Sequence, residues 1–316
     1  MKILLTGCLG FIGSNTVPKL LNSGHSIVGF DNRSNTSIKP TDRMKLESGP
    51  NWDNFKFYDC DIRNIQMMHT ICANEKPEAI IHLAALGSVP RSFNTPNEVV
   101  SVNEYGFTNI MMLAAQLQIK KVVFASSSSV YGNSPYSKKT EGAEGMPLSP
   151  YALTKAHNEM FAKIWALSTD INYVGLRFFN VYGPGQNFNS SYSAVIPRFI
   201  NSNKITIYGN GEITRDFTYV DDVASAISLA MNVKGRNIVC NIGTGLPTTL
   251  NELAKIISNG EKQIERIEGR LLDIPNSVAD ISKAKEVLGY EPQINIKSGI
   301  EKTISYYKSI NEQQVL

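Results

Sequence analysis

The stretch MKILLTGCLGFIG, Met1 to Gly13, decides the fold that this sequence predicts. Its apolar run up to Thr6 is typical of a buried strand, and Gly7, Gly10 and Gly13 then recur at intervals of three before a helical pattern. Glycines at a strand-to-helix turn permit a tight bend, the close approach of a pyrophosphate and close packing of helix on strand. The helix N-terminus offers N–H groups and a positive dipole end to the phosphates. The stretch therefore predicts a dinucleotide-binding loop, with a plain tight turn as the alternative.

A carboxylate ends the next predicted strand: Asp31 lies 18 residues after Gly13. An acidic side chain at this position hydrogen-bonds a ribose diol and repels a 2′-phosphate. The sequence therefore predicts NAD rather than NADP, although Arg33 lies close in sequence and carries a charge that suits a phosphate.

Short apolar runs alternate with longer helical patterns over the first 180 residues. The expected strands are 1–6, 26–31, 55–59, 79–83, 121–126 and 174–179. The expected helices are 12–23, 65–74, 97–117 and 151–168. Strands that are buried on both faces and separated by helices imply parallel βαβ units. The predicted fold class is α/β, with a Rossmann-type doubly wound parallel sheet.

Loops rich in Asn, Gly, Ser and Pro interrupt this pattern after about residue 180. Further strands are expected at 205–208 and 237–242, and helices at 220–231, 249–258, 282–288 and 297–309. We predict an NAD-binding Rossmann domain over residues 1–180, which also holds part of the active site. Residues 181–316 are predicted to form mainly a smaller C-terminal α/β lobe that binds the substrate, with the chain crossing between the lobes.

Charge and composition exclude several classes of protein. A formal net charge of +3 over 316 residues argues against a nucleic-acid binder. No run reaches the ~18 apolar residues of a membrane helix, and the first apolar run is too short for a signal peptide. The four cysteines and four histidines are scattered without metal-ligand spacing, so no metal is expected. The cysteines fit the reduced thiols of a cytoplasmic protein.

Motifs along nearly the whole chain resemble those of the extended short-chain dehydrogenase/reductases, specifically the nucleotide-sugar 4-epimerases. They are TGCLGFIG, DCDI, HLAA, FASSSSVYG, PYALTK, RFFNVYGPGQ, RDFTYVDDV, NIGTG, SVADISKA and LGYEP. Their order and spacing are highly specific for the superfamily and less specific for the reaction. The resemblance implies NAD-dependent inversion of C4 of a UDP-sugar through a 4-keto intermediate, with NAD kept as a bound prosthetic group. UDP-GlcNAc and UDP-GalNAc are the expected pair, with UDP-Glc and UDP-Gal as further candidates.

The resemblance also assigns residues to the cofactor. It implies that Asp61 and Ile62 lie beside the adenine, and that Asn103 supports the fold near the active site. For HLAA, the alternative is a strand end followed by small residues. The predicted cofactor-binding residues are Gly7, Gly10, Phe11, Ile12, Gly13, Asp31, Asn32, Asp61, Ile62, Leu83, Ala84, Ala85, Tyr151, Lys155 and Phe178.

Ser127, Tyr151 and Lys155 are the predicted catalytic residues. Tyr151 and Lys155 share one helix face at i and i+4, which by itself is more typical of a solvated surface. The resemblance makes Tyr151 the acid/base, Lys155 its electrostatic partner and a ligand of the nicotinamide ribose, and Ser127 the hydroxyl that relays the substrate proton, with Ser128 as its alternative. A charge at ~4 Å with an effective dielectric of ~20 is worth about 4 kcal/mol. We therefore expect Lys155 to lower the pKa of Tyr151.

The substrate contacts are likewise implied by the resemblance. Two arginines would clamp the diphosphate, an aspartate would hold a ribose hydroxyl, and Tyr208 would stack on the uracil. Taken singly, each of these residues is better explained as a surface charge or a packing side chain, and its position within the motifs is what favours substrate binding. The predicted substrate-binding residues are Ser88, Ser127, Ser128, Asn180, Val195, Tyr208, Arg215, Arg270, Asp273 and Ser277.

Two departures from the family pattern bear on the substrate. The sequence RLLD, Arg270 to Asp273, lacks the glycine of the family's arginine-x-glycine-aspartate pattern, which leaves the role of Arg270 open. Ser277 stands where some galactose-specific epimerases carry a bulky tyrosine, so room remains for a 2-acetamido group. Together with GSVPRS, Gly87 to Ser92, this resembles the epimerases that act on UDP-N-acetylhexosamines, with Ser88 facing the sugar.

The same residues also bear on other functions. A 4,6-dehydratase needs an acidic pair beside the catalytic hydroxyl, where this chain has Ser128 and Ser129. A nucleotide-keto-sugar reductase or another sugar-modifying member of the superfamily stays open, although Asp31 disfavours the phosphorylated cofactor that a reductase usually takes. For a decarboxylase we can place no basic group that would bind the carboxylate. A non-enzymatic dinucleotide sensor is disfavoured because Tyr151 and Lys155 are both present.

The two helices expected at 97–117 and 151–168 carry more apolar surface than one sheet face needs. Phe161, Ile164 and Trp165 are examples on the second helix. In the resembling family such helices pair across a two-fold axis, so we expect a homodimer, with simple core packing as the alternative.

Overall fold

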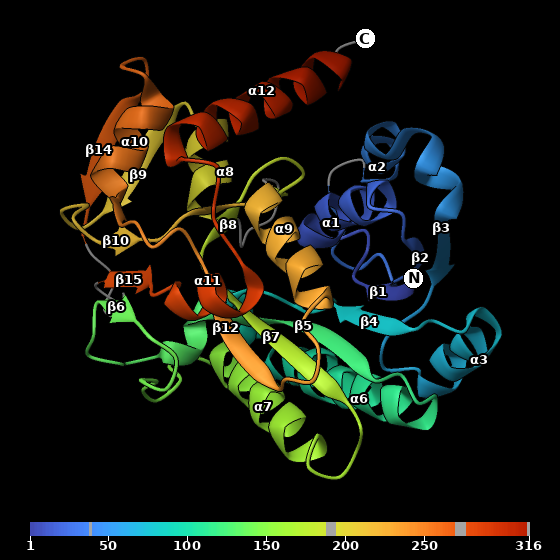
Figure 1. Ribbon diagram of the computed structural model, residues 1–316. Helices are drawn as coiled ribbons and strands as arrows, with labels where there is room; N and C mark the ends of the chain where they lie inside the picture. Colours follow the sequence, from blue (N-terminus) through green and yellow to red (C-terminus); the bar gives the residue numbers. More distant parts are fainter. Residues whose placement is uncertain (38–39, 188–193, 269–275, 315–316) are drawn as a thin grey trace.

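The computed structural model describes residues 1–37, 40–187, 194–268 and 276–314. A seven-stranded sheet lies at the centre of the molecule, with the order β12-β7-β5-β4-β1-β2-β3 (Figure 1). Its strands are β1 (Lys2–Thr6), β2 (Ser26–Asp31), β3 (Phe55–Asp59), β4 (Ala79–His82), β5 (Lys121–Ser127), β7 (Asn172–Phe178) and β12 (Ile238–Ile242). All neighbouring strands pair in parallel. The strand order reverses at β1, so the predicted doubly wound α/β fold of the Rossmann type is confirmed.

Helices cover both faces of this sheet (Figure 1). One face carries α1 (Phe11–Asn22), α9 (Val220–Met231) and α11 (Ser282–Leu288), with α2 (Pro40–Ser48) beside α1. The other face carries α3 (Ile65–Glu75), α6 (Gly106–Gln116) and α7 (Pro150–Trp165). Within β1, Ile3 and Leu5 belong to the first core and Leu4 to the second. This alternation of wholly apolar side chains is what a strand buried on both faces requires.

The helix expected over 97–117 consists of three successive segments. They are α5 (Pro96–Val100), the π-helical turn η2 (Ser101–Tyr105) and α6. Buried Asn103 lies in the π turn, where its side-chain oxygen accepts the N–H of Leu86 at 2.8 Å. Its amide nitrogen donates to the Leu86 carbonyl at 3.2 Å and to the Thr154 hydroxyl at 3.1 Å. Asn103 thus ties the loop after β4 to the start of α7, as the resemblance implied.

A second lobe follows β7 and has its own core, which includes Phe199, Ile207 and Leu253. Its elements are β8 (Val181–Tyr182), α8 (Val195–Asn201), β9 (Lys204–Tyr208), β10 (Thr214–Arg215), β11 (Thr218–Tyr219), β13 (Thr248–Thr249), α10 (Leu250–Ser258), β14 (Gln263–Ile267), β15 (Asn276–Ala279) and α12 (Ile296–Gln314). The remaining short elements are η1 (Gly49–Asn54), α4 (Val89–Asn94), η3 (Ser128–Tyr131) and β6 (Lys138–Lys139). Most of the unexpected elements are too short to show a period in the sequence.

The chain crosses back from this lobe to the central sheet. The strand expected at 237–242 is β12, which pairs with β7 as the seventh strand of the sheet. Helices α9 and α11 pack on the same sheet face as α1. Segments on both sides of residue 180 therefore contribute to the central sheet and its helices. The domain boundary at residue 180 stays a prediction. Within the described parts of the chain, no helix has both the length and the apolar character that crossing a bilayer demands.

Candidate active site

A cavity of about 860 Å³ opens at the carboxyl ends of the sheet strands. Its wall is built by the segments that follow β1, β2, β3, β4, β5 and β7, by α7 and by the second lobe. Ligands of doubly wound sheets bind at this edge. All fifteen predicted cofactor-binding residues line the cavity, as do Ser88, Ser128, Asn180, Arg215 and Ser277. The structure therefore brings the predicted residues together, while their binding roles stay predictions.

The glycine loop forms one end of this cavity. Gly7 has φ +71°, and a Cβ on it would lie 2.7 Å from the backbone nitrogen of Ala84. A Cβ on Gly13 would overlap the carbonyl oxygen of Gly7. By contrast, a Cβ on Gly10 would meet only the Gly7 oxygen, at 3.2 Å. The loop is thus closed on its protein side and lies open on the cavity side, as a cradle for a pyrophosphate requires.

Asp31 lies beside this loop at the end of β2. Its carboxylate accepts the Leu9 N–H at 3.0 Å and the Arg33 N–H at 2.8 Å, and burial raises its pKa. Arg33 adopts a left-handed backbone, with φ 58°. Its guanidinium lies 3.5 Å from Asp59 and 5.0 Å from the ring centre of Phe57, and Arg33 is not among the described residues that line the cavity. The arrangement thus presents a carboxylate to the cavity and fits the ribose diol of NAD.

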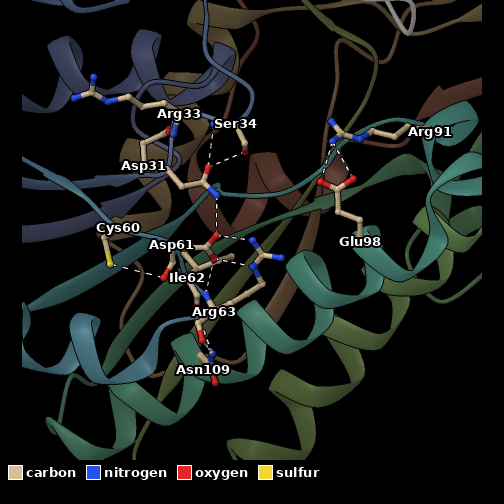
Figure 2. Close-up of polar contacts among 11 residues, drawn as sticks. Asp31, Arg33, Ser34, Cys60, Asp61, Ile62, Arg63, Arg91, Glu98 and Asn109 are labelled. Atoms are coloured by element: carbon tan, nitrogen blue, oxygen red, sulfur yellow. Dashed lines mark hydrogen bonds and ion pairs between the residues drawn. The ribbon is translucent and has the colours of Figure 1, made fainter.

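Asp61 marks the next position along the cavity (Figure 2). Arg63 donates hydrogen bonds to the Asp61 carboxylate from Nε at 2.9 Å and from a terminal nitrogen at 2.7 Å. The Asn32 side chain donates to the same carboxylate at 2.8 Å. Hydrogen bonding by Arg63 is the main cause that lowers the pKa of Asp61 to about 2. The neighbouring Ile62 carbonyl accepts from Asn109 on α6 at 3.1 Å, which fixes the backbone beside this carboxylate (Figure 2).

The loop after β4 forms the wall between the two ends of the cavity. Leu83, Ala84 and Ala85 all line it. The N–H of Ala84 donates to the Thr6 hydroxyl at 3.3 Å, and that hydroxyl lies 2.8 Å from Nδ1 of the buried His82. Burial and the charge of Lys155 lower the pKa of His82 to about 3, so the ring is neutral. The side chains of β1 and β4 therefore hold the small residues close to the glycine loop.

Ser127, Tyr151 and Lys155 meet at the end of β5. Ser149 caps α7, and its hydroxyl accepts the Ala152 N–H at 3.1 Å, so that the helix begins just before Tyr151. Ser127 lines the same cavity as Tyr151, and its hydroxyl acts to lower the pKa of Tyr151. The Ser127 hydroxyl oxygen accepts the Ser129 N–H at 3.2 Å. The buried Lys155 donates from Nζ to the Ala125 carbonyl at 2.8 Å, and Nζ lies 6.0 Å from the ring centre of Tyr151.

The expected lowering of the Tyr151 pKa is wrong for this structure. Burial raises the pKa of Tyr151, and the nearby Ser127 hydroxyl opposes this without reversing it. Lys155 lies over the ring and is bound to a backbone carbonyl. Burial also lowers the pKa of Lys155 to about 8, against a rise caused by Glu159. The site thus favours the neutral forms of both Tyr151 and Lys155. Groups whose pKa values are shifted in this way are typical of active sites.

The second lobe closes the far side of the cavity with β10 and β15. These strands run parallel, with Arg215 directly beside Ser277. Asp216, fully buried, accepts the backbone N–H groups of Thr244 at 2.8 Å, Gly245 at 2.9 Å and Ala279 at 3.2 Å. One aspartate therefore fixes both strands at the end of β12.

A smaller cavity of about 280 Å³ adjoins the first and shares Asn180, Arg198 and Arg215 with it. Val195 and Tyr208, the predicted uracil contacts, line the smaller cavity. The residues predicted at the remaining substrate contacts, Arg270 and Asp273, lie outside the described residues. All the described substrate-binding residues line one or both of the two cavities.

Several residues of these walls are not predicted from the sequence. Arg198 on α8 lines both cavities, and its guanidinium carbon lies 5.8 Å from the ring centre of Tyr208. Ser34 and Asn35 extend the wall beyond Asp31. None of them belongs to a motif or a periodic pattern, so only their neighbours in space reveal their position.

These features define a class of protein: a dinucleotide-binding sheet with a serine, tyrosine and lysine beside the cofactor groove. A sequence profile described as the NAD dependent epimerase/dehydratase family matches residues 3–243, and the chain belongs to this family. The residues of the glycine loop and of Asp31 fit its cofactor, NAD.

Individual relatives agree on the type of reaction and differ in the sugar. The chain is 34% identical over 310 residues to the UDP-glucuronate 4-epimerase of Thermodesulfobacterium geofontis, covering 96% of this chain and 95% of that protein. The crystal structure of the Thermotoga maritima UDP-glucose 4-epimerase with UDP-glucose has a TM-score of 0.91 and 34% identity, covering 98% and 100% of the two chains. The UDP-N-acetylglucosamine 4-epimerase of Methanobrevibacter ruminantium, in complex with UDP-N-acetylmuramic acid, has a TM-score of 0.90 and 33% identity, covering 98% of each chain.

Proposed function

We propose that the protein inverts C4 of a UDP-sugar through a 4-keto intermediate, as an NAD-dependent 4-epimerase. The observation that carries this proposal is that Tyr151, Ser127 and Lys155 line the same cavity as the glycine loop. The cavity joins a second one lined by Arg215 and Tyr208, so a nucleotide diphosphate fits beyond the reacting centre. The relatives compared above all carry 4-epimerase in their names.

Each catalytic side chain has a separate task in this reaction. Bound NAD supplies the acceptor and donor of the C4 hydride. Tyr151 takes the proton of the 4-hydroxyl at Oη and returns it, and Ser127 holds that hydroxyl in line. Because burial disfavours the phenolate, the base form of Tyr151 depends on a nearby positive charge, which Lys155 provides. Small side chains at Ser128 and Ser277 leave the sugar room to present its opposite face.

Incubation of the purified protein with a UDP-sugar and no added cofactor tests this function. An epimerase that retains NAD interconverts UDP-GlcNAc and UDP-GalNAc, or UDP-Glc and UDP-Gal, which is measured by chromatography of the nucleotide sugars. A keto-sugar reductase converts none of them and consumes added reduced cofactor with a 4-keto substrate. Consumption of reduced cofactor without interconversion of the sugars would contradict the proposal in favour of a reductase. A non-enzymatic sensor would show neither interconversion nor cofactor consumption.

We further propose that N-acetylated sugars are the preferred substrates. Ser277 is buried, lines the large cavity and lies next to Arg215 across the β10–β15 pair. A serine at this position occupies little of the space that an acetamido group needs. Gly87 and Ser88 line the same cavity, and the Tyr151 hydroxyl lies 4.0 Å from the place of a Cβ on Gly87.

A homodimer is also proposed, formed by the helices on the α7 side of the sheet. Leu153, Met160 and Ile164 form an apolar stripe on α7 and are 57–59% exposed, and Tyr105 on the adjacent η2 is 54% exposed. A second copy of the same face would bury this stripe. The double variant Met160→Glu/Ile164→Glu is expected to elute as a monomer in size-exclusion chromatography with light scattering. Leu46→Glu, at an 84% exposed leucine on α2, serves as the control and keeps the dimer; equal behaviour of the two variants would contradict this interface.

We propose a cytoplasmic location for the protein. Its four cysteines are all free and buried. Thiols persist in this form in reducing compartments. Fractionation of the source cells with an antibody would test the proposal, and recovery outside the cytoplasmic fraction would contradict it.

A further inference from the structure

A buried cluster of charges lies behind the catalytic residues, on the side of α7 that faces β5 and β7. Arg177 on β7 is 5% exposed and donates to Glu159 on α7 through Nε at 2.9 Å and a terminal nitrogen at 2.7 Å. Its other terminal nitrogen donates to Glu144, and the guanidinium lies 4.9 Å from the ring centre of Tyr131. A buried pair of this bidentate form is rigid, because an unpaired charge in this place is costly.

The cluster is connected to the end of β5. The Ser126 hydroxyl donates to the same carboxylate oxygen of Glu159 that accepts from Arg177 Nε. Ala125, one residue earlier, receives the hydrogen bond of Lys155 Nζ at 2.8 Å. Ser127, one residue later, lines the cavity together with Tyr151 and acts on its pKa. Three consecutive residues of β5 thus meet three side chains of α7.

Those three side chains follow the period of the helix. Tyr151, Lys155 and Glu159 lie at i, i+4 and i+8, so they project from one face of α7. The carboxylate at the third position is fixed from outside the helix by Arg177. Among the described residues, the ammonium at the second position donates to the Ala125 carbonyl. The position of Lys155 therefore depends on the contacts that Glu159, one turn further along α7, makes with β5 and β7.

We propose that Glu159, clamped by Arg177 and Ser126, is a positioning residue that holds Lys155 charged and directed at the reacting end of β5. It touches neither the cavity nor the phenol and acts through Lys155. The tests that measure turnover rest on the proposed epimerase function, whereas the titration of Lys155 does not.

The charged and titratable groups around Lys155 make the sign of this effect clear. Tyr151 and Glu159 face Lys155 from its own helix. The buried His82 faces Lys155 from β4 and is neutral, because its pKa is about 3. Arg177 from β7 and Glu144 pair with each other beyond Glu159. Burial lowers the pKa of Lys155 to about 8 while Glu159 raises it, so loss of the Glu159 charge lowers it further. Fewer molecules then carry the ammonium at alkaline pH.

The pH dependence of kcat separates this role from a merely structural one. Glu159→Gln is expected to move the alkaline limit of kcat to lower pH by about one unit, with a roughly tenfold loss of turnover above pH 8. Glu144→Gln is the matched control, because Glu144 binds the same guanidinium through its other terminal nitrogen, whereas Glu159 is the carboxylate that acts on the pKa of Lys155. It should leave the alkaline limit unchanged. A folded Glu159→Gln protein with the wild-type limit, or an equal shift in Glu144→Gln, would overturn the proposal.

Two further measurements keep the test decisive. Competitive acetylation of Lys155 at a series of pH values, followed by mass spectrometry of its peptide, reports its titration without any turnover. The midpoint should fall in Glu159→Gln and not in Glu144→Gln, even if the protein proves to act on another substrate. If Glu159→Gln does not fold, Ser126→Ala removes one hydrogen bond to Glu159 and should shift the alkaline limit in the same direction by a smaller amount. An unchanged limit and acetylation midpoint in a folded Ser126→Ala protein would then reject the proposal.

Discussion

Tyr151 is the residue on which the chemistry depends, and its surroundings explain both of its protonation states. The raised pKa keeps the phenol protonated at neutral pH, so that a proton is present to be donated, although the phenol is then a weaker acid. The same burial makes it a poor base until positive charge is close. Lys155 carries that charge and is itself only partly protonated near pH 8, because burial lowers its pKa. The pair is thus sensitive to any change in nearby charge.

Replacement of the phenol tests its role directly. Tyr151→Phe should retain bound NAD, because the glycine loop and Asp31 are untouched, and should lose turnover by about 10²–10⁴-fold, the usual contribution of a positioned acid/base. Bound NAD is measured after heat release and turnover by chromatography. Tyr136→Phe, which removes the hydroxyl of a 61% exposed tyrosine, is the control. Activity of Tyr151→Phe equal to that of Tyr136→Phe would refute the mechanism.

Ser277 decides the sugar in the proposed function. Ser277→Tyr should cut kcat/KM for UDP-GlcNAc by more than tenfold, because the ring would fill the space beside Arg215, and should spare UDP-Glc. One methylene more or less in a hydrophobic pocket changes the preference between two substrates by about 10–200-fold. The much larger tyrosine ring can therefore produce a tenfold effect by steric exclusion alone. Ser277→Ala keeps the small volume and should keep both activities. An equal loss on both sugars would reject the proposed preference.

At the scale of elements, strand ends and helix starts position the site. The turn from β1 to α1 depends on glycines because the backbone of the loop after β4 approaches it closely, as the place of a Cβ on Gly7 indicates. The start of α7 depends on the Ser149 cap, and its docking depends on the π turn η2 through Asn103. The same contacts that end these elements therefore line up the reacting groups.

Gly13→Ala should disrupt the first of these turns. The added methyl overlaps the Gly7 carbonyl, and relief of such overpacking costs about 1–3 kcal/mol. We expect a lower midpoint of thermal unfolding and loss of NAD binding, measured by calorimetry. Gly24→Ala is the control: it has no atom within 4 Å of the new Cβ and carries only the strain of a positive φ. Normal NAD binding by Gly13→Ala would show that the loop does not have to keep this path.

The long elements could be predicted from the sequence, and the contacts between them could not. Hydrophobic period and length are enough for strands such as β1 and helices such as α7, whereas strands of two residues and a π turn leave no periodic signal. The motifs also identified Ser127, Tyr151 and Lys155. Glu159 lies outside the quoted motifs, and Arg177 opens the motif RFFNVYGPGQ without a role that the motif reveals, because a charge in a helix or strand is usually solvated. The burial of this pair arises from the pairing of β5 with β7 and the packing of α7 on both.

At the scale of the whole molecule, the buried groups of the sheet make stability depend on pH. His82 is 2% exposed and has a pKa of about 3, whereas an unfolded chain has a histidine pKa near 6.5. Below pH 6.5 the unfolded chain therefore binds a proton that the folded protein excludes, and stability is lost as the pH falls. Integration of this difference gives a loss of about 2 kcal/mol between pH 7 and pH 5.

His82→Gln removes this titration and provides the measurement. Urea unfolding followed by circular dichroism at pH 7 and pH 5 should show wild-type protein losing about 2 kcal/mol more than the variant. Glutamine can still hydrogen-bond Thr6, and comparison of the two proteins cancels the contributions of the other histidines. Equal losses in both proteins would contradict a neutral, buried imidazole at position 82.

The return of the chain to the sheet as β12 has a consequence for the biosynthesis of the protein. During translation, the edge of β7 stays uncovered until residue 242 has left the ribosome, since no earlier segment of the described chain pairs with it there. An exposed parallel edge of seven residues, Asn172 to Phe178, is then available to other nascent chains. Truncated products that stop near residue 180 are therefore expected to depend on chaperones or to aggregate, however complete their nucleotide-binding motifs are.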